Sequence, residues 1–359
     1  MSKLNSFLAQ KVTYDSDEGT FARFHSEALG GPSHGNGGAT SSTTPSPTLV
    51  TTSGSHLEFN LVWDSSVANL GSNETAFMNA MINVAKYYET VFSTPKLEII
   101  NIKVGWGEIN GQSLPSGALG ASQTTGYITN FSTVSSHLAA DGFSFKASNE
   151  PTSAQFFISS AEAKSFGLIS PTSSGVDGYV GFGTLSGTGH SWNFTSSAAT
   201  GQGSGTAGQQ FDFQGTAQHE LSEVMGRIEM EGHATFNGKA TYTPLDLFNF
   251  DSPGHLVLSG GANAGTQASS YFSVDNGSTH LGNFNDGYQG GDIADWASYS
   301  SSSQAGTDYS AQSGFQPLPS GFQDAYDAFG YPGANSDLSY SDQLAMETVG
   351  LFSTGVLIS

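Results

Sequence analysis

Positive charge is scarce in this chain of 359 residues, and that scarcity limits what its interior can contain. Ten Lys and Arg residues accompany 31 Asp and Glu residues, which gives a formal net charge of −21. A carboxylate buried without a partner is costly, so each interior Asp or Glu needs a cation or several hydrogen bonds. Because few basic side chains are available, a metal ion is the simplest partner for a buried group of carboxylates.

Charge and composition also exclude several classes of protein. A surface this acidic repels polyanions, so we expect no nucleic-acid partner. The sequence contains no Cys, which excludes disulfides, thiolate metal ligands and Cys nucleophiles. No run of about 18 apolar residues occurs, so we expect no insertion into a membrane. The aromatic share of 12% indicates that the chain can nevertheless bury a core.

Composition divides the chain into three segments. Residues 1–55 are rich in Gly, Ser and Thr and lack apolar periodicity, so we expect a flexible N-terminal arm there. Residues 56–352 carry the periodic segments of one domain. Residues 353–359 form an uncharged, largely apolar tail that resembles the secretion signals of bacterial type I substrates.

The N-terminus bears on where the protein works. It lacks an apolar signal-peptide core, so the chain either stays in the cytosol or leaves without a cleaved signal. The acidic, Cys-free, Gly-rich composition is typical of proteins exported by type I secretion. We therefore expect a secreted protein, extracellular or on the cell surface.

Hydrophobic periodicity predicts a fold of class α+β. Alternating or continuous apolar residues predict strands, at residues 57–63, 97–104, 155–158, 177–182 and 271–278. Apolar spacings of three and four predict helices, at residues 75–92, 128–141, 160–166, 215–227 and 339–351. We expect a twisted, mostly antiparallel or mixed sheet that carries the first helix, with the fourth helix beneath a substrate cleft. The Gly-rich residues 183–210 are expected to form a long loop.

The chemistry-bearing residues are concentrated in the segment His219-Glu220-Leu221-Ser222-Glu223. On a helix, His219 and Glu223 share a face, so both can bind one metal ion. Glu220 projects to the side, where it can accept a proton from water, as in His-Glu-x-x-His peptidases. Glu223 replaces the second His of that motif, and zinc accepts a carboxylate oxygen as a ligand. The alternative is a solvated helix face with a chance His–Glu pair.

Residues 219–229 resemble the metzincin pattern His-Glu-x-x-His-x-x-Gly-x-x-His, with Gly226 at the turn position and Glu at both later His positions. The chain also resembles a family of bacterial secreted metalloproteases with the signature His-Glu-[Ile/Leu]-Ser-Glu-Val-Met-Gly-Arg. This resemblance extends over residues 57–350, and includes residues 64–67, 105–108, 177–182, 242–248 and 271–277.

The resemblance implies a function. It makes residues 56–352 a metzincin-like metallopeptidase domain and the protein a secreted zinc-dependent metalloendopeptidase, a hydrolase acting on protein or peptide substrates. His219 and Glu223 would hold the metal, and Glu220 would be the general base. As in metzincins, an edge strand above the cleft would hold an extended peptide.

The third metal ligand has two candidates. Glu229 occupies the metzincin-like position, and Asp246 lies in residues 244–248, a segment that recurs in the similar family. We rank Asp246 slightly above Glu229, because a Glu at position 229 is not part of the family signature. One His and two carboxylates would make a more negative site than most peptidase zinc sites, so another divalent metal such as calcium or manganese is also a credible occupant.

Other acidic residues and another class of function remain open. Asp275 and the group of Asp286, Asp292 and Asp295 could ligate calcium, or could be turn residues that bond their own backbone. The competing function is a secreted structural or adhesive surface protein with a metal-stabilised, inactive peptidase fold. Hydrolysis of a non-peptide amide or ester is a third possibility. The identity of the metal, the cleavage preference and the oligomeric state do not follow from the sequence.

Overall fold

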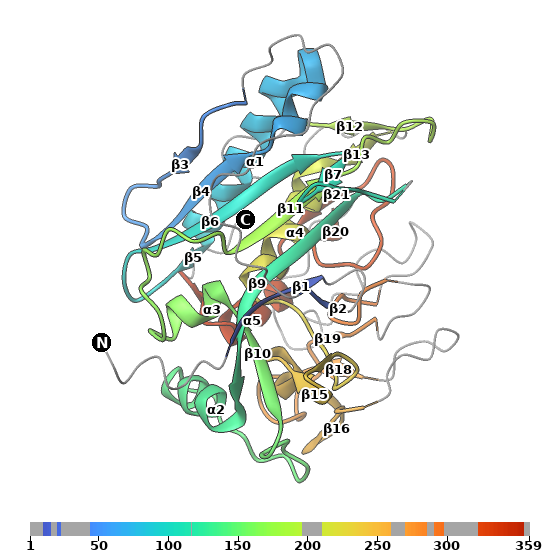
Figure 1. Ribbon diagram of the computed structural model, residues 1–359. Coiled ribbons are helices and arrows are strands. Elements are labelled where there is room, and N and C mark those ends of the chain that lie inside the picture. The colour runs from blue at the N-terminus through green and yellow to red at the C-terminus, as the bar shows by residue number, and fades with distance from the viewer. Residues whose placement is uncertain are drawn as a thin grey trace.

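A twisted mixed sheet forms the centre of the molecule, and helices pack against it (Figure 1). The computed structural model describes residues 10–15, 20–22, 44–115, 117–195, 210–259, 270–285, 291–297 and 322–354. The sheet has ten strands, with the main order β14-β15-β10-β9-β11-β6-β4-β3. This mixed α and β architecture is compatible with the predicted α+β class.

One half of the sheet contains parallel strands. β4 (Leu57–Trp63), β6 (Glu98–Trp106) and β11 (Gly178–Phe182) run parallel to one another, and β3 (Thr48–Val50) pairs antiparallel with β4. Burial alternates along β4, as its apolar alternation predicts.

β9 (Gly120–Asn130) is the longest described strand, and it joins the two halves of the sheet. It pairs antiparallel with three strands: β1 (Gln10–Asp15), β10 (Gln155–Ser159) and β11. β1 overlaps the registers of both other strands. Because a strand has only two edges, β1 takes one of them, and β11 and β10 follow each other along the second. The pairing with β1 ends at Gln123, so residues 120–122 extend beyond it.

The remaining strands are short. On the main sheet, β15 (Lys239–Tyr242) is parallel to β10, and β14 (Thr235–Phe236) and β2 (Thr20–Ala22) complete the edges. The smaller sheets pair β12 (Ser191–Asn193) with β13 (Gln210–Asp212), β20 (Phe322–Asp324) with β21 (Asn335–Asp337), β5 (Phe92–Ser93) with β22 (Phe352–Ser353), and β7 (Glu108–Ile109) with β8 (Gln112–Ser113). A four-stranded sheet contains β17 (His255–Leu256), β16 (Asn249–Ser252), β18 (Tyr271–Phe272) and β19 (Gly282–Asn283).

The five α-helices of the described chain lie where periodicity predicts helices. They are α1 (Glu74–Val91), α2 (Phe131–Ala140), α3 (Ser160–Ser165), α4 (Phe213–Met225) and α5 (Tyr340–Thr348), with 3₁₀ helices η2 (Ser65–Asn73) and η3 (Leu245–Phe248). Ser159 and Ser339 begin α3 and α5 with capping boxes. None of the described helices is long and apolar enough to cross a membrane.

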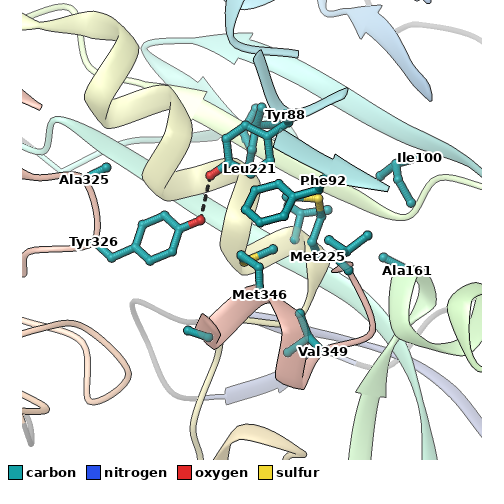
Figure 2. Packing of buried hydrophobic residues seen from close by; sticks show 14 of the residues in the cluster. Tyr88, Phe92, Ile100, Ala161, Leu221, Met225, Ala325, Tyr326, Met346 and Val349 are labelled. Carbon is teal, nitrogen blue, oxygen red and sulfur yellow. Dashed lines mark hydrogen bonds between the residues drawn. The ribbon is translucent and has the colours of Figure 1, made fainter. Parts of the chain in front are cut away.

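The core beneath α4 joins distant parts of the chain. α4 packs against β9, β11 and α1, and its residues Leu221 and Met225 are fully buried. Figure 2 shows them beside Met346 of α5, with the hydroxyl groups of Tyr88 and Tyr326 2.8 Å apart. Tyr88 also donates to the carbonyl of Gln218, which holds α1 against α4. This packing fixes the helix that carries the candidate site.

Parts of the predicted arm belong to the sheet. β1, β2 and β3 all lie within residues 1–55, and Val12 of β1 is fully buried. The expectation of an irregular arm is therefore wrong for these strands. Residues 1–9, 16–19 and 23–43 lie outside the described residues, as do residues 196–209 of the expected loop and residues 355–359 of the tail.

β9 is not among the predicted strands, and its last residues, 128–130, belong to a predicted helix. β9 contains few apolar residues, so it shows no apolar alternation. Ser122, Thr124 and Thr125 are nevertheless fully buried or nearly so. Two of these hydroxyls donate to Glu223 of α4, one to its carboxylate and one to its carbonyl. Polar residues on this strand therefore serve to hydrogen-bond α4.

Glu98 generates a prediction about pH. Its side chain is 1% exposed, and Oε1 has no hydrogen-bond partner among the described residues. Burial raises the pKa of Glu98 from 4.5 to about 8, although Lys164 opposes the shift. The pKa of Glu98 is therefore higher in the folded than in the unfolded chain. As a result, the contribution of Glu98 to the free energy of unfolding falls as the pH rises from about 4.5, and is lost once the pH has passed about 8.

We expect the free energy of unfolding of the wild type to fall by about 2–3 kcal/mol more than that of Glu98→Gln between about pH 6 and about pH 8.5. Urea denaturation of both proteins at the two pH values measures the difference. Equal pH dependence in the two proteins would contradict a buried, neutral Glu98.

Candidate metal centre

α4 presents the predicted site residues on a helix with defined ends. The side chain of Asp212 accepts a hydrogen bond from the N–H of Gln214 at its start. Gly226 ends the helix with a φ of 124°, a conformation that favours glycine. A Cβ at position 226 would also lie 2.6 Å from Cδ of Glu162. The chain therefore leaves the helix at Gly226, the predicted turn position.

His219, Glu223 and Asp295 come together at one point. Nε2 of His219 lies 3.1 Å from Oδ1 of Asp295 and 3.4 Å from Oε1 of Glu223. Each of the three residues offers one ligand atom, and these atoms lie within 4.8 Å of one another. Ligands at about 2.1 Å from a tetrahedral zinc ion are roughly 3.4 Å apart. The donor set and its spacing therefore fit a divalent metal ion.

A backbone carbonyl orients the ring of His219. Nδ1 lies 3.0 Å from the carbonyl oxygen of Ala325. A carbonyl can only accept, so Nδ1 donates and Nε2 faces the two carboxylates. Outer hydrogen bonds of this kind hold metal-ligating His residues in position.

The carboxylates make this point attractive to a cation. Burial opposes a charge on His219, but Asp295 and Glu223 outweigh it and raise the pKa of His219 well above its usual range. An unprotonated Nε2 would point its lone pair at two negative oxygens. A proton or a metal ion must therefore lie between them.

Arg227 completes the buried network. It is fully buried, and donates to Oδ1 of Asp295 at 2.8 Å and to Oε1 of Glu223 at 3.3 Å. Its Nε donates to Ser222, and its guanidinium lies 4.5 Å from the ring centre of Tyr326. Burial opposes ionisation of Glu223 and Asp295, but His219 and Arg227 outweigh it and hold the pKa of both carboxyls below their usual values.

The charge of Arg227 changes what the donor set can do. Two carboxylates and one guanidinium carry a formal charge of −1 together with a neutral His219. A set of two neutral His residues and one carboxylate carries the same charge. Arg227 therefore offsets the extra negative charge of a site built from one His and two carboxylates.

β9 supports the site from the opposite side. Oγ of Ser122 donates to Oε2 of Glu223 at 2.6 Å, so the second oxygen of that carboxylate is also held. The hydroxyl of Thr124 donates to the carbonyl oxygen of Glu223 at 2.9 Å. Both bonds limit the rotation of the ligand side chain and of its helix turn.

The donor atoms open onto a cavity of about 390 Å³. The side chain of His219 is 16% exposed, against 2% for Glu223 and 4% for Asp295, so a ligand would approach from the His219 side. The acidic residues of the cavity wall include Glu220, Asp292, Asp324 and Asp327 besides the metal-binding group. No Lys or Arg of the described chain lines it.

Glu220 lies in the cavity wall together with His219, Glu223 and Asp295. Its carboxylate packs against the start of β9. A Cβ at position 120 would lie 2.2 Å from Oε1 of Glu220, so a larger residue there would displace this carboxylate. Glu220 is not one of the three grouped ligands, which agrees with a role separate from metal binding.

Neither predicted third ligand joins His219 and Glu223. Asp246 accepts hydrogen bonds from the backbone N–H groups of Met230, Glu231 and Thr243, so it holds two loops together. The carboxylate of Glu229 accepts from Nδ2 of Asn249 at 3.3 Å. The structure corrects the prediction, since the third member of the group is Asp295.

The four Asp residues named as calcium candidates lie in different surroundings. Asp275 accepts hydrogen bonds from the N–H and hydroxyl of Thr279 and from the hydroxyl of Ser273, as a turn residue does. Asp292 lines the cavity, Asp295 belongs to the metal-binding group, and Asp286 lies outside the described residues.

Two members of the site carried weak signals in the sequence. Asp295 lies in a Gly-rich segment in which nothing indicates contact with α4, so the sequence presents it only as a calcium candidate. Arg227 had a stronger signal. It is one of only ten basic residues, and it follows Glu223 by four residues, the spacing at which helical side chains come together.

Known proteins add no further assignment. Comparisons with protein-family models, with curated proteins and with solved structures return no match.

The geometry predicts the effect of removing each candidate third ligand. We expect Asp295→Asn to weaken zinc binding by at least about 100-fold, because it removes a charged ligand atom. Glu229→Gln should bind zinc as the wild type does, and serves as the matched control. Competition with a chromophoric chelator measures both affinities. Loss of binding in Glu229→Gln, with binding retained in Asp295→Asn, would reverse the assignment.

Proposed function

We propose that this chain is a metal-dependent peptidase in which His219, Glu223 and Asp295 hold a divalent ion and Glu220 is the general base. One observation carries the proposal: three donor atoms with the spacing of metal ligands line the same cavity as a carboxylate on the next residue of the helix. This is the arrangement that the His-Glu-x-x-His motif provides, with Glu223 in place of its second His and Asp295 as the third ligand.

The residues of the site divide the work of hydrolysis. A divalent ion bound here would polarise the scissile carbonyl and make water more acidic. Glu220 would take the proton from the attacking water and pass it to the leaving amine. Ala325, Ser122 and Arg227 hold the metal-binding side chains in place, so that little reorganisation accompanies reaction.

The start of β9 offers a place for an extended substrate. Gly117, Ala118, Leu119 and Gly120 line the cavity. β11 covers one edge of this segment, and β1 ends before residues 120–122. An extended peptide that pairs with the other edge would lie along the cavity. This supports a protein or peptide substrate and a metzincin-like arrangement of strand, cleft and helix.

Zinc is the ion that we propose. The −1 charge of the donor set with Arg227 is that of common peptidase zinc sites, which supports zinc over the harder ions calcium and manganese. We also propose that the protein works outside the cell, as its acidic and Cys-free composition suggests.

One observation favours the competing function. Arg227 bridges Glu223 and Asp295, and with a protonated His219 this network would be balanced without any metal ion. A secreted structural or adhesive protein with an inactive peptidase fold would need no more than that.

Replacing the proposed base separates the two functions. We expect wild-type protein supplied with zinc to cleave casein and to hold one ion per chain. Glu220→Gln should hold the same amount of zinc, but its rate of cleavage should fall by about 10²–10⁴-fold. Glu150→Gln, on a loop outside the cavity, is the matched control and should keep both properties.

The outcomes are distinguishable by elemental analysis and by product detection. A wild type that binds zinc but cleaves no protein or peptide would support the inactive fold. A wild type that binds no divalent ion would overturn the metal centre itself.

Gly120 provides an independent test of the position of Glu220. We expect Gly120→Ala to displace the Glu220 carboxylate, because the added methyl occupies its place. The rate should fall by roughly 100-fold, with zinc content unchanged. A steady-state assay and elemental analysis on the same sample check this. Full activity in Gly120→Ala would show that Glu220 does not act from its present position.

A further inference from the structure

We propose that the cavity contains a second subsite, formed by Gln323, Asp324 and Asp327, that receives the positively charged end of a Lys or Arg side chain of the substrate. The inference rests on the proposed peptidase function, and adds a substrate class to it.

The three residues lie on one side of the cavity, at the end of β20 and in the turn that follows. The N–H of Tyr326 donates to Oδ1 of Asp324 at 2.9 Å, which shapes this turn. A β-bridge joins Asp327 to Trp296, the residue after Asp295. The subsite is therefore fixed relative to the metal centre, as a specificity pocket must be relative to the reacting bond.

Two acceptor atoms of the subsite lack a donor. Oδ2 of Asp327 and Oε1 of Gln323 are buried, and neither has a hydrogen-bond partner within the described chain. Gln323 is 1% exposed, and its amide nitrogen donates to the carbonyl oxygen of Phe329, so Oε1 is the side-chain atom without a partner in the described chain. Buried acceptors of this kind are costly unless a ligand satisfies them. An ammonium or guanidinium group carries several donors and would satisfy both.

The charge of the cavity favours the same ligand. Burial and the neighbouring Asp324 raise the pKa of Asp327 well above its usual range, although a hydrogen bond from the side chain of Gln323 and the charge of His219 oppose the shift. A positive group placed beside the two carboxyls would remove their repulsion. No Lys or Arg of the described chain lines the cavity, and Arg227 is engaged by Glu223 and Asp295.

A basic side chain fits better than a second metal ion. Within the described chain, His219, Glu223 and Asp295 are the one group of three or more acidic or His side chains with the spacing of metal ligands. Asp324 and Asp327 do not belong to this group. Two carboxylates and an amide are few ligands for calcium, which takes 6–8 oxygens. Leu119, Ala328 and Phe329 add apolar surface to the cavity, against which the methylene stem of Lys or Arg can lie.

The test uses the full chain loaded with zinc and a peptide library whose products are identified by mass spectrometry. We expect Lys and Arg to be enriched at one fixed position relative to the cleaved bond. Matched peptides with Lys, norleucine or Glu at that position then give ratios of kcat/KM. The wild type should prefer Lys over norleucine by at least about tenfold, and Asp327→Asn should lose most of that ratio.

Two further measurements complete the design. Asp251→Asn removes an exposed carboxylate outside the cavity, so its ratio should equal that of the wild type. Fluorescence anisotropy with labelled Lys and norleucine peptides, on zinc-loaded Glu220→Gln, measures the same preference in binding without cleavage. The ratio of kcat/KM for the Lys and norleucine peptides is measured on the wild type alone. It therefore tests the subsite even if Asp327→Asn folds poorly.

Each result has a separate meaning. Cleavage without a preference for Lys or Arg would overturn the subsite and leave the peptidase intact. No cleavage, with tighter binding of the Lys peptide, would overturn the peptidase and keep the subsite. Calcium binding that is lost in Asp327→Asn, with no preference among the peptides, would make this a metal site and overturn the proposal.

Discussion

The candidate site depends on the hydrogen bonds that the buried guanidinium of Arg227 donates to two carboxylates. Arg227 bonds Glu223 on α4 and Asp295 on a distant segment, and so brings together two carboxylates that would otherwise repel each other. It also joins α4 to the loop at Ala294 through the carbonyl oxygen. Removing Arg227 would leave two buried carboxylates facing His219 alone, and uncompensated buried charges are strongly destabilising. One basic residue therefore both assembles the donor set and adjusts its charge.

β9 is the second support of the site, and its polar sequence follows from that role. The strand lies under α4, where apolar side chains would suffice for packing, yet Ser122 and Thr124 are the residues in contact with Glu223. At its beginning, Gly120 leaves room for the carboxylate of Glu220. The same strand thus holds a carboxylate of the candidate metal centre and positions the proposed base. Its edge at residues 120–122, beyond the end of β1, is the part that a peptide substrate could pair with.

The predictable parts of the fold are those where one face is apolar and the other is not. β4 and α1 were predicted from their periodicity within a residue, because burial alternates along the first and follows a helical stripe on the second. β9 was not predicted, because hydroxyl groups make its buried contacts and the strand therefore shows no apolar alternation. In the site, the pair His219 and Glu223 follows from helical spacing, which is local. Asp295 and Ala325 reach the same point only through tertiary packing, so no local pattern could indicate them.

A comparison of two buried acidic groups shows why the α4 site is suited to a cation. Near β6, Lys164 is paired with Asp177, and the additional carboxyl, Glu98, is neutralised by a proton because burial raises its pKa to about 8. The formal charges of that group therefore balance. At α4 the pKa values of Glu223 and Asp295 are held below normal, so both carboxyls keep their charge while Arg227 supplies a single positive one. The remaining negative charge faces Nε2 of His219 and an open cavity. It can be met by a proton on the imidazole, and a metal ion that displaces this proton would gain three ligands already at the required spacing.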